Sequence, residues 1–118
     1  MGKRFSSGLV LHSEGMALIK VGRLEDVPPG QVVQAIYGDR IFAVCNLDGK
    51  LYCLDGTCPH AGGPLGEGIL QGEMLVCPWH GWEFNCVTGA NDDDEDLVVD
   101  HFPVRVENGD ILIDIPEN

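Results

Sequence analysis

The stretch CPWHGW, at residues 77–82, places one cysteine, one histidine and two tryptophans within six residues. A second stretch, CPHAGG at residues 58–63, lies upstream and also contains one cysteine and one histidine. Thiolate and imidazole are the protein groups that bind zinc and iron centres. Two such stretches in one short chain therefore predict a metal centre. The alternative, two unrelated pairs of a buried cysteine and an exposed histidine, explains the pattern less well.

The four candidate ligands are spaced as Cys58-x-His60, sixteen residues, and then Cys77-x-x-His80. Each pair is followed by glycine, which lets a backbone turn sharply and approach a bound group closely. These glycines are Gly62, Gly63 and Gly81. Prolines within both stretches restrict the loops and lower the entropy lost when the loops become ordered.

Two metal centres are compatible with this spacing. One is a single tetrahedral zinc with two sulfur and two nitrogen ligands. The other is a two-iron cluster with two cysteines on one iron and two histidines on the other. Zinc modules usually take each ligand pair from one residue type, whereas each loop here supplies one cysteine and one histidine. The mixed loops favour a dinuclear centre held from both sides.

Outside these two stretches, frequent turn signals divide the chain into short alternating segments with little helical periodicity. We expect strands at 17–23, 31–37, 40–46, 50–56, 69–71 and 74–77, and a closing hairpin through Asn108 and Gly109. Residues 24–30 read as a turn, and the Gly/Pro-rich residues 57–68 as a loop that serves the metal centre. Many short strands joined by turns predict an all-β antiparallel sandwich or barrel.

The 118 residues suffice for one compact domain. We expect residues 1–15 to be a disordered leader or expression tail and residues 16–118 to be the folded domain. The chain has no apolar run long enough to span a membrane and no recognisable secretory signal, so the expected location is the cytoplasm.

The charge is strongly acidic, with a formal net charge of −12. From residue 51 onward Arg105 is the only Lys or Arg, against fourteen Asp and Glu. Such a surface repels nucleic acid and anionic lipid and suits docking on a basic protein surface, although solubility alone would also explain it. The acidic run 92–96 is read as a solvated loop, with partner docking as the alternative.

Five cysteines in a chain without an export signal indicate metal or redox chemistry rather than a disulfide framework. In a two-residue hairpin at Asp48-Gly49, Val44 would oppose Cys53, so Cys45 and Cys53 would lie on opposite faces and could not form a disulfide. We interpret Cys45, Cys53 and Cys86 as small buried side chains. Redox sensing by Cys86 is the alternative.

The motifs CPHAGGPLGEG and CPWHGWEFN, followed by TG, closely resemble those of the Rieske [2Fe–2S] ferredoxins, and the resemblance extends over about residues 17–116. It implies a β-sandwich carrying a small cluster-binding subdomain at about residues 56–84. By this resemblance Cys58 and Cys77 bind the inner iron, and His60 and His80 bind the outer iron near the surface.

The resemblance also separates this chain from the high-potential Rieske proteins of respiratory cytochrome bc complexes. Those proteins have a disulfide where this chain has Gly63 and Trp79, and serine and tyrosine hydroxyls where it has Trp82 and Phe84. Hydrogen bonds to the cluster sulfurs raise the reduction potential, so the missing hydroxyls predict a potential of roughly −150 mV. The residues expected to surround the ligands are Gly62, Gly63, Trp79, Gly81, Trp82 and Phe84.

The resemblance therefore implies a monomeric one-electron carrier between a flavin-containing reductase and a terminal ring-hydroxylating oxygenase, with no small-molecule substrate of its own. His12 and His101 are the only other histidines, and they do not supply the two histidines and a carboxylate of a mononuclear iron site. The alternatives are a small subunit of an assimilatory nitrite reductase, which shares the fold, and a structural zinc or protein-interaction module.

Overall fold

The computed structural model describes residues 10–13, 16–59, 62–79, 81–94 and 96–116. These residues form antiparallel strands and two single-turn 3₁₀ helices, η2 (Leu24–Asp26) and η3 (Leu65–Glu67), with no α-helix among them. No helix in the described part of the chain is long and apolar enough to cross a membrane. The all-β antiparallel fold expected from the sequence is confirmed.

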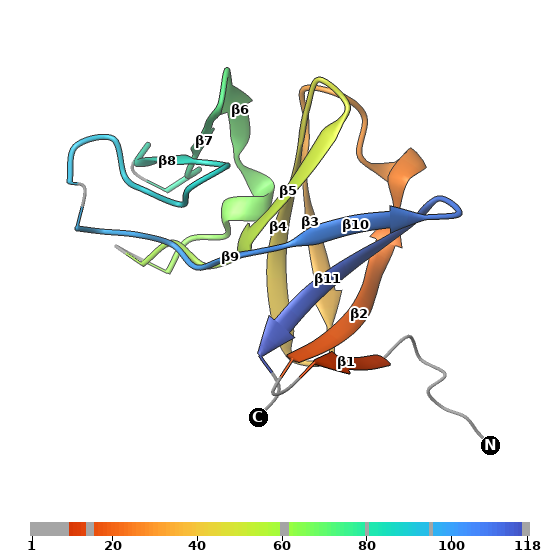
Figure 1. Cartoon of the computed structure of the whole chain (residues 1–118). Coiled ribbons are helices and arrows are strands. Elements are labelled where there is room, and N and C mark those ends of the chain that lie inside the picture. Colours follow the sequence, from red (N-terminus) through yellow and green to blue (C-terminus); the bar gives the residue numbers. More distant parts are fainter. Residues whose placement is uncertain (1–9, 14–15, 60–61, 80, 95, 117–118) are drawn as a thin grey trace.

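Three sheets account for the strands (Figure 1). The first has the order β1 (Val10–Ser13), β2 (Met16–Arg23), β11 (Asp110–Pro116) and β10 (Val104–Glu107). The second has the order β3 (Val32–Tyr37), β4 (Arg40–Leu47), β5 (Lys50–Asp55) and β9 (His101–Phe102). The third has the order β6 (Ile69–Gln71), β7 (Met74–Val76) and β8 (Glu83–Asn85).

Strand β1 lies within the segment 1–15 for which a disordered leader was expected. It pairs antiparallel with β2, with Val10 opposite Leu18 and Leu11 opposite Ala17. The outer edge of β2 offers unpaired backbone groups, and β1 satisfies them. Four residues of the expected leader thus extend the first sheet, whereas residues 1–9 and 14–15 lie outside the described residues.

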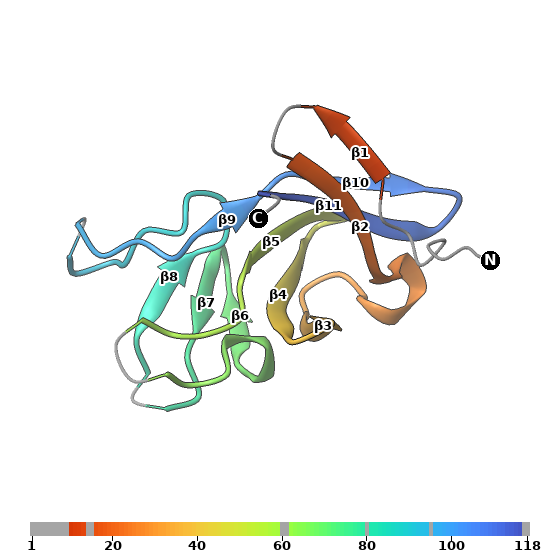
Figure 2. The ribbon, with the colours of Figure 1, turned by 90° about the horizontal axis from the view of Figure 1, so that it is seen from below.

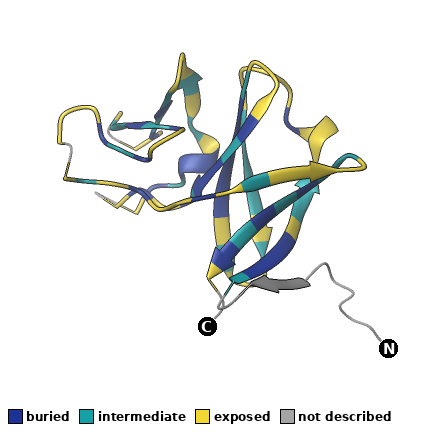
Figure 3. Cartoon of the chain, viewed as in Figure 1, coloured by how far each residue is buried: buried dark blue, intermediate teal, exposed yellow. Residues whose placement is uncertain are grey.

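The central sheet separates two apolar cores. Phe42 and Val44 of β4 face the first core, between the first and second sheets, together with Ile19 and Ile113. Ala43 and Cys45 of the same strand face the second core, which lies against the third sheet. Because both faces are covered, five successive residues of β4 are buried (Figure 3).

The hairpin of β4 and β5 turns through Asp48 and Gly49, which both have positive φ angles, 55° and 98°. This type of turn matches the twist of paired strands and fixes their register. Cys45 consequently lies opposite Tyr52 and not opposite Cys53. Cys45 faces the second core and Cys53 the first, so the expectation of opposite faces is confirmed.

Asn46 is the buried polar residue that secures this hairpin. Its side chain is 2% exposed. The Nδ2 group donates a hydrogen bond to the Val27 carbonyl at 2.7 Å, and Oδ1 accepts one from the Gly49 N–H at 2.7 Å. Both ends of the amide are therefore satisfied, which is the condition for burying a polar group without a large cost.

Candidate metal centre

The first candidate ligand loop, residues 58–63, leaves the central sheet at the end of β5. The Gly56 N–H donates to the Ile41 carbonyl at 2.9 Å, and the Leu65 N–H donates to the Gly56 carbonyl at 2.9 Å. A further bridge joins Thr57 to Pro64. These bonds bring the two ends of the loop together at the edge of the central sheet.

The glycines after this loop serve close packing. A Cβ atom on Gly66 would lie 2.6 Å from the Cα of Gln34 on β3, and one on Gly68 would overlap the Val76 carbonyl oxygen. Their absence lets η3 pack on the central sheet and on β7. Close packing thus explains two of the glycines in residues 57–68, and it holds the segment after the first loop against the third sheet.

The second candidate ligand loop, residues 77–82, connects β7 to β8. Val76 pairs with Glu83 just before and after it, and the neighbouring pair, Leu75 and Phe84, is fully buried. The sequence pattern predicts a strand over residues 74–77, but β7 ends at Val76. Cys77 consequently belongs to the loop and not to the ladder.

The two loops close in the same way. In each, the cysteine carbonyl accepts a hydrogen bond from a glycine N–H four residues later, at 2.8 Å from Gly62 and 3.1 Å from Gly81. In each, the cysteine N–H donates to a carbonyl five residues later, at 2.8 Å in both cases. Both glycines have positive φ angles, 77° and 74°, which glycine adopts without strain. One backbone motif therefore presents both cysteines.

The two cysteine side chains meet in the second core. Cys58 is 1% exposed and Cys77 is 2% exposed, and the Cys58 thiol is close enough to raise the pKa of Cys77. Burial raises the pKa of Cys77, although the Trp79 N–H, 3.4 Å from its Sγ, works in the opposite direction. A thiolate in this apolar site needs a nearby positive charge, which a bound metal supplies. The two buried sulfurs are therefore suited to binding a metal.

Gly63 and Trp79 connect the two loops. A Cβ atom on Gly63 would lie 2.9 Å from the Cys77 Sγ and 2.9 Å from Cγ of Trp79. The Trp79 ring thus packs over the first loop while remaining 49% exposed. These contacts place Gly63 and Trp79 beside the Cys77 sulfur.

The other expected neighbours divide into two groups. Phe84 is fully buried in the second core with Cys58 and Cys77, and Trp82 packs against that core. Gly62 and Gly81 are exposed and close the loops. His60 and His80 lie outside the described residues, so the histidine ligands stay a prediction. The described residues alone include no group of three or more potential metal ligands.

Of the two remaining histidines, the structure describes the side chain of His101 alone. His101 is exposed on β9, as expected for a surface residue, where it lies opposite Leu54. His12 belongs to β1, whose side chains lie outside the description.

Sequence reasoning missed the anchor of the acidic run 92–96. Asn91 is 4% exposed, and its Nδ2 donates to the Glu83 carbonyl at 3.1 Å. Its Oδ1 accepts hydrogen bonds from the Asp93 and Asp94 N–H groups at 3.0 and 2.9 Å. The described part of the run is therefore fixed beside β8 and the second ligand loop. An Asn directly before a polar run was the available signal.

One cysteine loop follows β5 of the central sheet and the other joins β7 to β8 of the third sheet, and together they define a class of metal proteins in which two loops hold one centre. The sequence profile of the Rieske [2Fe-2S] domain matches residues 17–103, and the chain belongs to this family. Its cofactor is accordingly one Rieske-type [2Fe–2S] cluster. The alternative of a single structural zinc is not the cofactor of this family.

Relatives of known role share most of the chain. The ferredoxin component of biphenyl 2,3-dioxygenase from Rhodococcus jostii is 32% identical over 101 residues, which cover 85% of this chain and 94% of that protein. A chain from a complex of reduced oxygenase and oxidized ferredoxin in carbazole 1,9a-dioxygenase superposes with a TM-score of 0.74 at 28% identity. That match covers 86% of this chain and 95% of the other.

The fold is also similar to that of a putative NADH-dependent nitrite reductase small subunit from Mycobacterium tuberculosis. The TM-score is 0.77 at 22% identity, covering 87% of this chain and 98% of the other. At this identity the similarity concerns the fold alone. It explains why both kinds of protein were compatible with the strand pattern, and it does not choose between their functions.

Proposed function

We propose that this chain is a ferredoxin that carries single electrons from a flavin-containing reductase to a terminal ring-hydroxylating oxygenase. The observation that supports this role best is the pair of equivalent loops that bring Cys58 and Cys77 together at one end of a Rieske domain. When bound, the [2Fe–2S] cluster supplies reversible one-electron transfer. The chain itself holds the cluster, shields it and presents it to partners.

We assign the ligands to the four residues of the two motifs. The thiolates of Cys58 and Cys77 bind the inner iron, because both sulfurs are buried and close to each other. His60 and His80 bind the outer iron. Each histidine is followed closely by its loop-closing glycine, and Gly62 and Gly81 are both exposed. This arrangement supports an outer edge of the centre that a partner protein can approach.

We assign the centre to the low-potential end of the Rieske range, roughly −150 mV. Phe84 has no hydroxyl to donate, and it fills the buried position next to the cysteines. The Trp79 backbone N–H does donate to the Cys77 Sγ, at 3.4 Å, so a backbone donor is present but these aromatic side chains add no hydroxyl. The aromatic residues thus exclude water without supplying the hydroxyl donors that raise the potential.

We assign partner docking to the surface around the two loops and the acidic run 92–96. The run is fixed beside β8 by Asn91 and carries exposed carboxylates at Asp92, Asp93 and Asp94. Complementary charge accelerates protein encounter and is screened by salt. The carrier acts as a monomer that offers this surface to its reductase and its oxygenase in turn.

Electron delivery is tested by stopped-flow spectroscopy. The purified protein is reduced with dithionite, mixed anaerobically with an oxidised terminal oxygenase component of biphenyl 2,3-dioxygenase type, and followed by its visible absorption. We expect rapid oxidation of the carrier with matching reduction of the oxygenase. Absence of transfer, combined with stable co-purification of the chain with a large sirohaem subunit, would instead establish the nitrite reductase subunit.

The docking surface is tested in the same assay with two matched charge variants. Asp92→Asn with Asp93→Asn removes two charges beside the third sheet. Glu25→Gln with Asp26→Asn removes two exposed charges on η2, which precedes β3 on the sandwich. We expect the first variant to slow transfer at low salt, with the difference shrinking at high salt, and the second to behave as the wild type. Equal rates for both variants would remove the acidic run from the docking surface.

A further inference from the structure

A cleft of about 210 Å³ borders the first ligand loop. One wall is the end of β5 with the start of that loop. The other wall is the segment before β9, which passes from the third sheet to the sandwich (Figure 1, Figure 2). The lining residues are Asp55, Thr57, Pro59, Val98, Val99 and Asp100. Because Pro59 directly precedes the assigned ligand His60 in the chain, the cleft lies next to the surface to which we assign partner docking.

The two carboxylates of this cleft lie opposite each other. Strands β5 and β9 pair antiparallel, with Leu54 opposite His101. The Asp55 N–H donates to the Asp100 carbonyl at 2.8 Å, which continues this register by one residue. Opposed residues place their side chains on the same face, and like charges in such a pair destabilise the sheet. The chain therefore keeps two negative charges together at a cost in stability.

Neither carboxylate has an ion-pair partner in the part of the chain that the structure describes. The acidic partners of the ion pairs found there are Glu107 and Asp110. Arg40 lies on the neighbouring strand β4, but its guanidinium packs over the rings of Phe42 and Phe102, with its central carbon 5.2 and 5.9 Å from their centres. The two opposed charges are therefore available to a cation from outside the described chain.

The rest of the cleft suits the stem of a long basic side chain. Val98 is 48% exposed, and Pro59 is exposed on the opposite wall. Asp55 is fixed by the loop itself, because its Oδ1 accepts a hydrogen bond from the Thr57 N–H at 3.0 Å. Lys and Arg combine an aliphatic stem that packs on apolar surface with a charged end. The planar guanidinium of Arg also has several donors, which suits two carboxylates at once.

We propose that this cleft receives a basic side chain of the terminal oxygenase, an arginine by preference, when the reduced carrier docks. The inference rests on the proposed function, which makes the oxygenase the protein that oxidises the carrier. The bound side chain offsets the repulsion between Asp55 and Asp100, so the cost of holding them together is removed only in the complex. The contact also holds the first ligand loop against the partner. It extends the acidic run 92–96, which leads along the chain into Val98.

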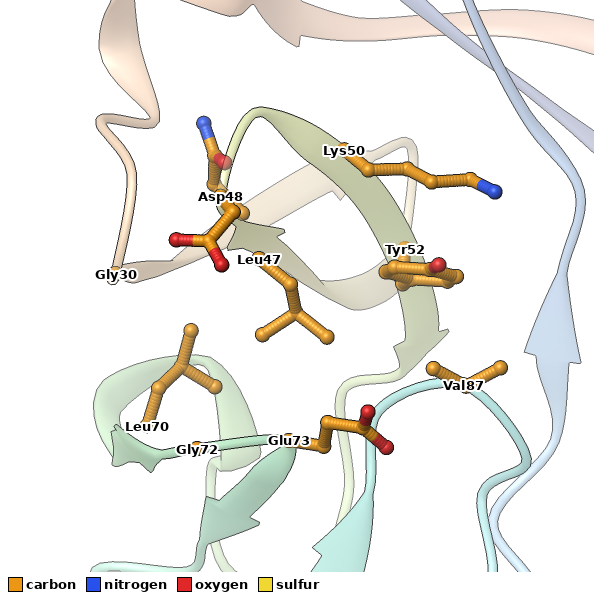
Figure 4. Close-up of a pocket in the computed structure, with 10 residues that line it drawn as sticks. Gly30, Leu47, Asp48, Lys50, Tyr52, Leu70, Gly72, Glu73 and Val87 are labelled. Atoms are coloured by element: carbon orange, nitrogen blue, oxygen red, sulfur yellow. The ribbon is translucent and has the colours of Figure 1, made fainter.

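A larger cleft supplies a matched control. It has a volume of about 490 Å³ and separates the hairpin of β4 and β5 from the turn between β6 and β7 (Figure 4). Asp48 and Glu73 line it, but Lys50 lines it too, so this cleft already contains a cation. Strand β7 runs from this turn to the second ligand loop, which places the turn and the loop at opposite ends of the strand. Neutralising its two carboxylates changes the net charge equally without touching the proposed contact.

The test is stopped-flow electron transfer from the dithionite-reduced holoprotein to the oxygenase component named above, at low and high salt. The test variant is Asp55→Asn with Asp100→Asn, in which residue 55 keeps an oxygen that can accept from the Thr57 N–H. The control variant is Asp48→Asn with Glu73→Gln. We expect the test variant to slow transfer by roughly fivefold or more at low salt and by less at high salt. The control variant should stay near the wild-type rate.

Thermal unfolding of the same variants separates docking from damage to the fold. The Asp55 and Asp100 variant should unfold at a temperature at least as high as the wild type, because the repulsion between the two charges is gone. Slower transfer together with a clearly lower unfolding temperature would contradict the proposal, since it would show that the two carboxylates support the fold.

Val98→Thr tests the apolar wall. Threonine keeps the branched shape of valine and adds a hydroxyl, so it weakens an apolar contact without emptying the cleft. We expect slower transfer at both salt concentrations, because salt does not screen an apolar contact. A Val98→Thr rate equal to the wild type at both concentrations would remove the apolar stem from the contact.

The outcomes for the cleft and for the carrier role are distinct. Rapid wild-type transfer with equal rates for both double variants would overturn the cleft proposal and leave the electron-carrier role intact. A test variant that slows reduction by the reductase alone would also overturn it, because the oxygenase would then not be the occupant. Wild-type protein that transfers no electron to the oxygenase would overturn the proposed function and this inference together.

Discussion

Replacing Gly63 with alanine should disrupt the metal centre, because the added methyl group would crowd the Cys77 sulfur and the Trp79 ring. The added Cβ would lie 2.9 Å from the Cys77 Sγ and 2.9 and 3.0 Å from two ring carbons of Trp79. Ordinary contacts of a Cβ atom are 3.4 Å or longer. The buried sulfur and the rigid ring must therefore both shift by several tenths of an ångström.

The expected cost follows from the general energetics of overpacked sites. Inserting one methyl group into a filled site costs about 1–3 kcal/mol. The apoprotein can relax by moving Trp79, which is half exposed, so the cost there falls at the lower end. With the cluster bound, the Cys77 sulfur is held by iron and cannot move away. The substitution should then reduce the iron content of the protein rather than unfold it.

The assay is iron per chain after anaerobic reconstitution, together with urea unfolding of the apoprotein. Gly22→Ala is the control, because its Cβ would meet no atom within 4 Å and its backbone lies outside the positive-φ region. We expect Gly63→Ala to bind clearly less iron than Gly22→Ala. Full iron content in Gly63→Ala with wild-type unfolding would refute the contact geometry between the two loops.

Three further substitutions test the frame around the site. Phe84→Ala should lower the free energy of unfolding by about 3–5 kcal/mol, since the ring is fully buried, as urea titration would measure. Asn46→Ala should cost about 1–3 kcal/mol in the same titration, because it leaves the Val27 carbonyl and the Gly49 N–H unpaired. Asp110→Asn concerns pH. Hydrogen bonds from Arg23 and Lys20 lower the pKa of Asp110 below 3.8, so the wild type should be the more stable above that pH. The difference should vanish as the pH falls through the lowered value, and a gap that persists under acid would contradict the ion pair.

Much of the frame could be predicted from local signals. Gly49 and Gly109 have positive φ angles in two hairpin turns that the sequence predicts. The register of the first hairpin places Cys45 and Cys53 on opposite faces of the sheet. The mixed Cys and His spacing pointed to a dinuclear centre, and family membership agrees with it. These signals act over a few residues, which is why the sequence alone carries them.

Other features depend on contacts between distant segments. The second core covers the face of β4 that carries Ala43 and Cys45, and no periodicity within β4 shows what lies opposite. Cys45 and Cys86 share the second core because the third sheet packs against the second. The strand at residues 10–13 depends on the free edge of β2. The roles of His60 and His80 stay predictions, because both lie outside the described residues.

The most direct test of the central claim is low-temperature electron paramagnetic resonance of the purified protein, treated first with ascorbate and then with dithionite, alongside iron and zinc analysis. The account predicts two irons per chain and a Rieske signal that appears only with dithionite, because Trp82 and Phe84 carry no hydroxyl that could donate to the cluster sulfurs. A signal already present with ascorbate would contradict the low potential assigned from Trp82 and Phe84. Zinc without any signal would contradict the cluster itself.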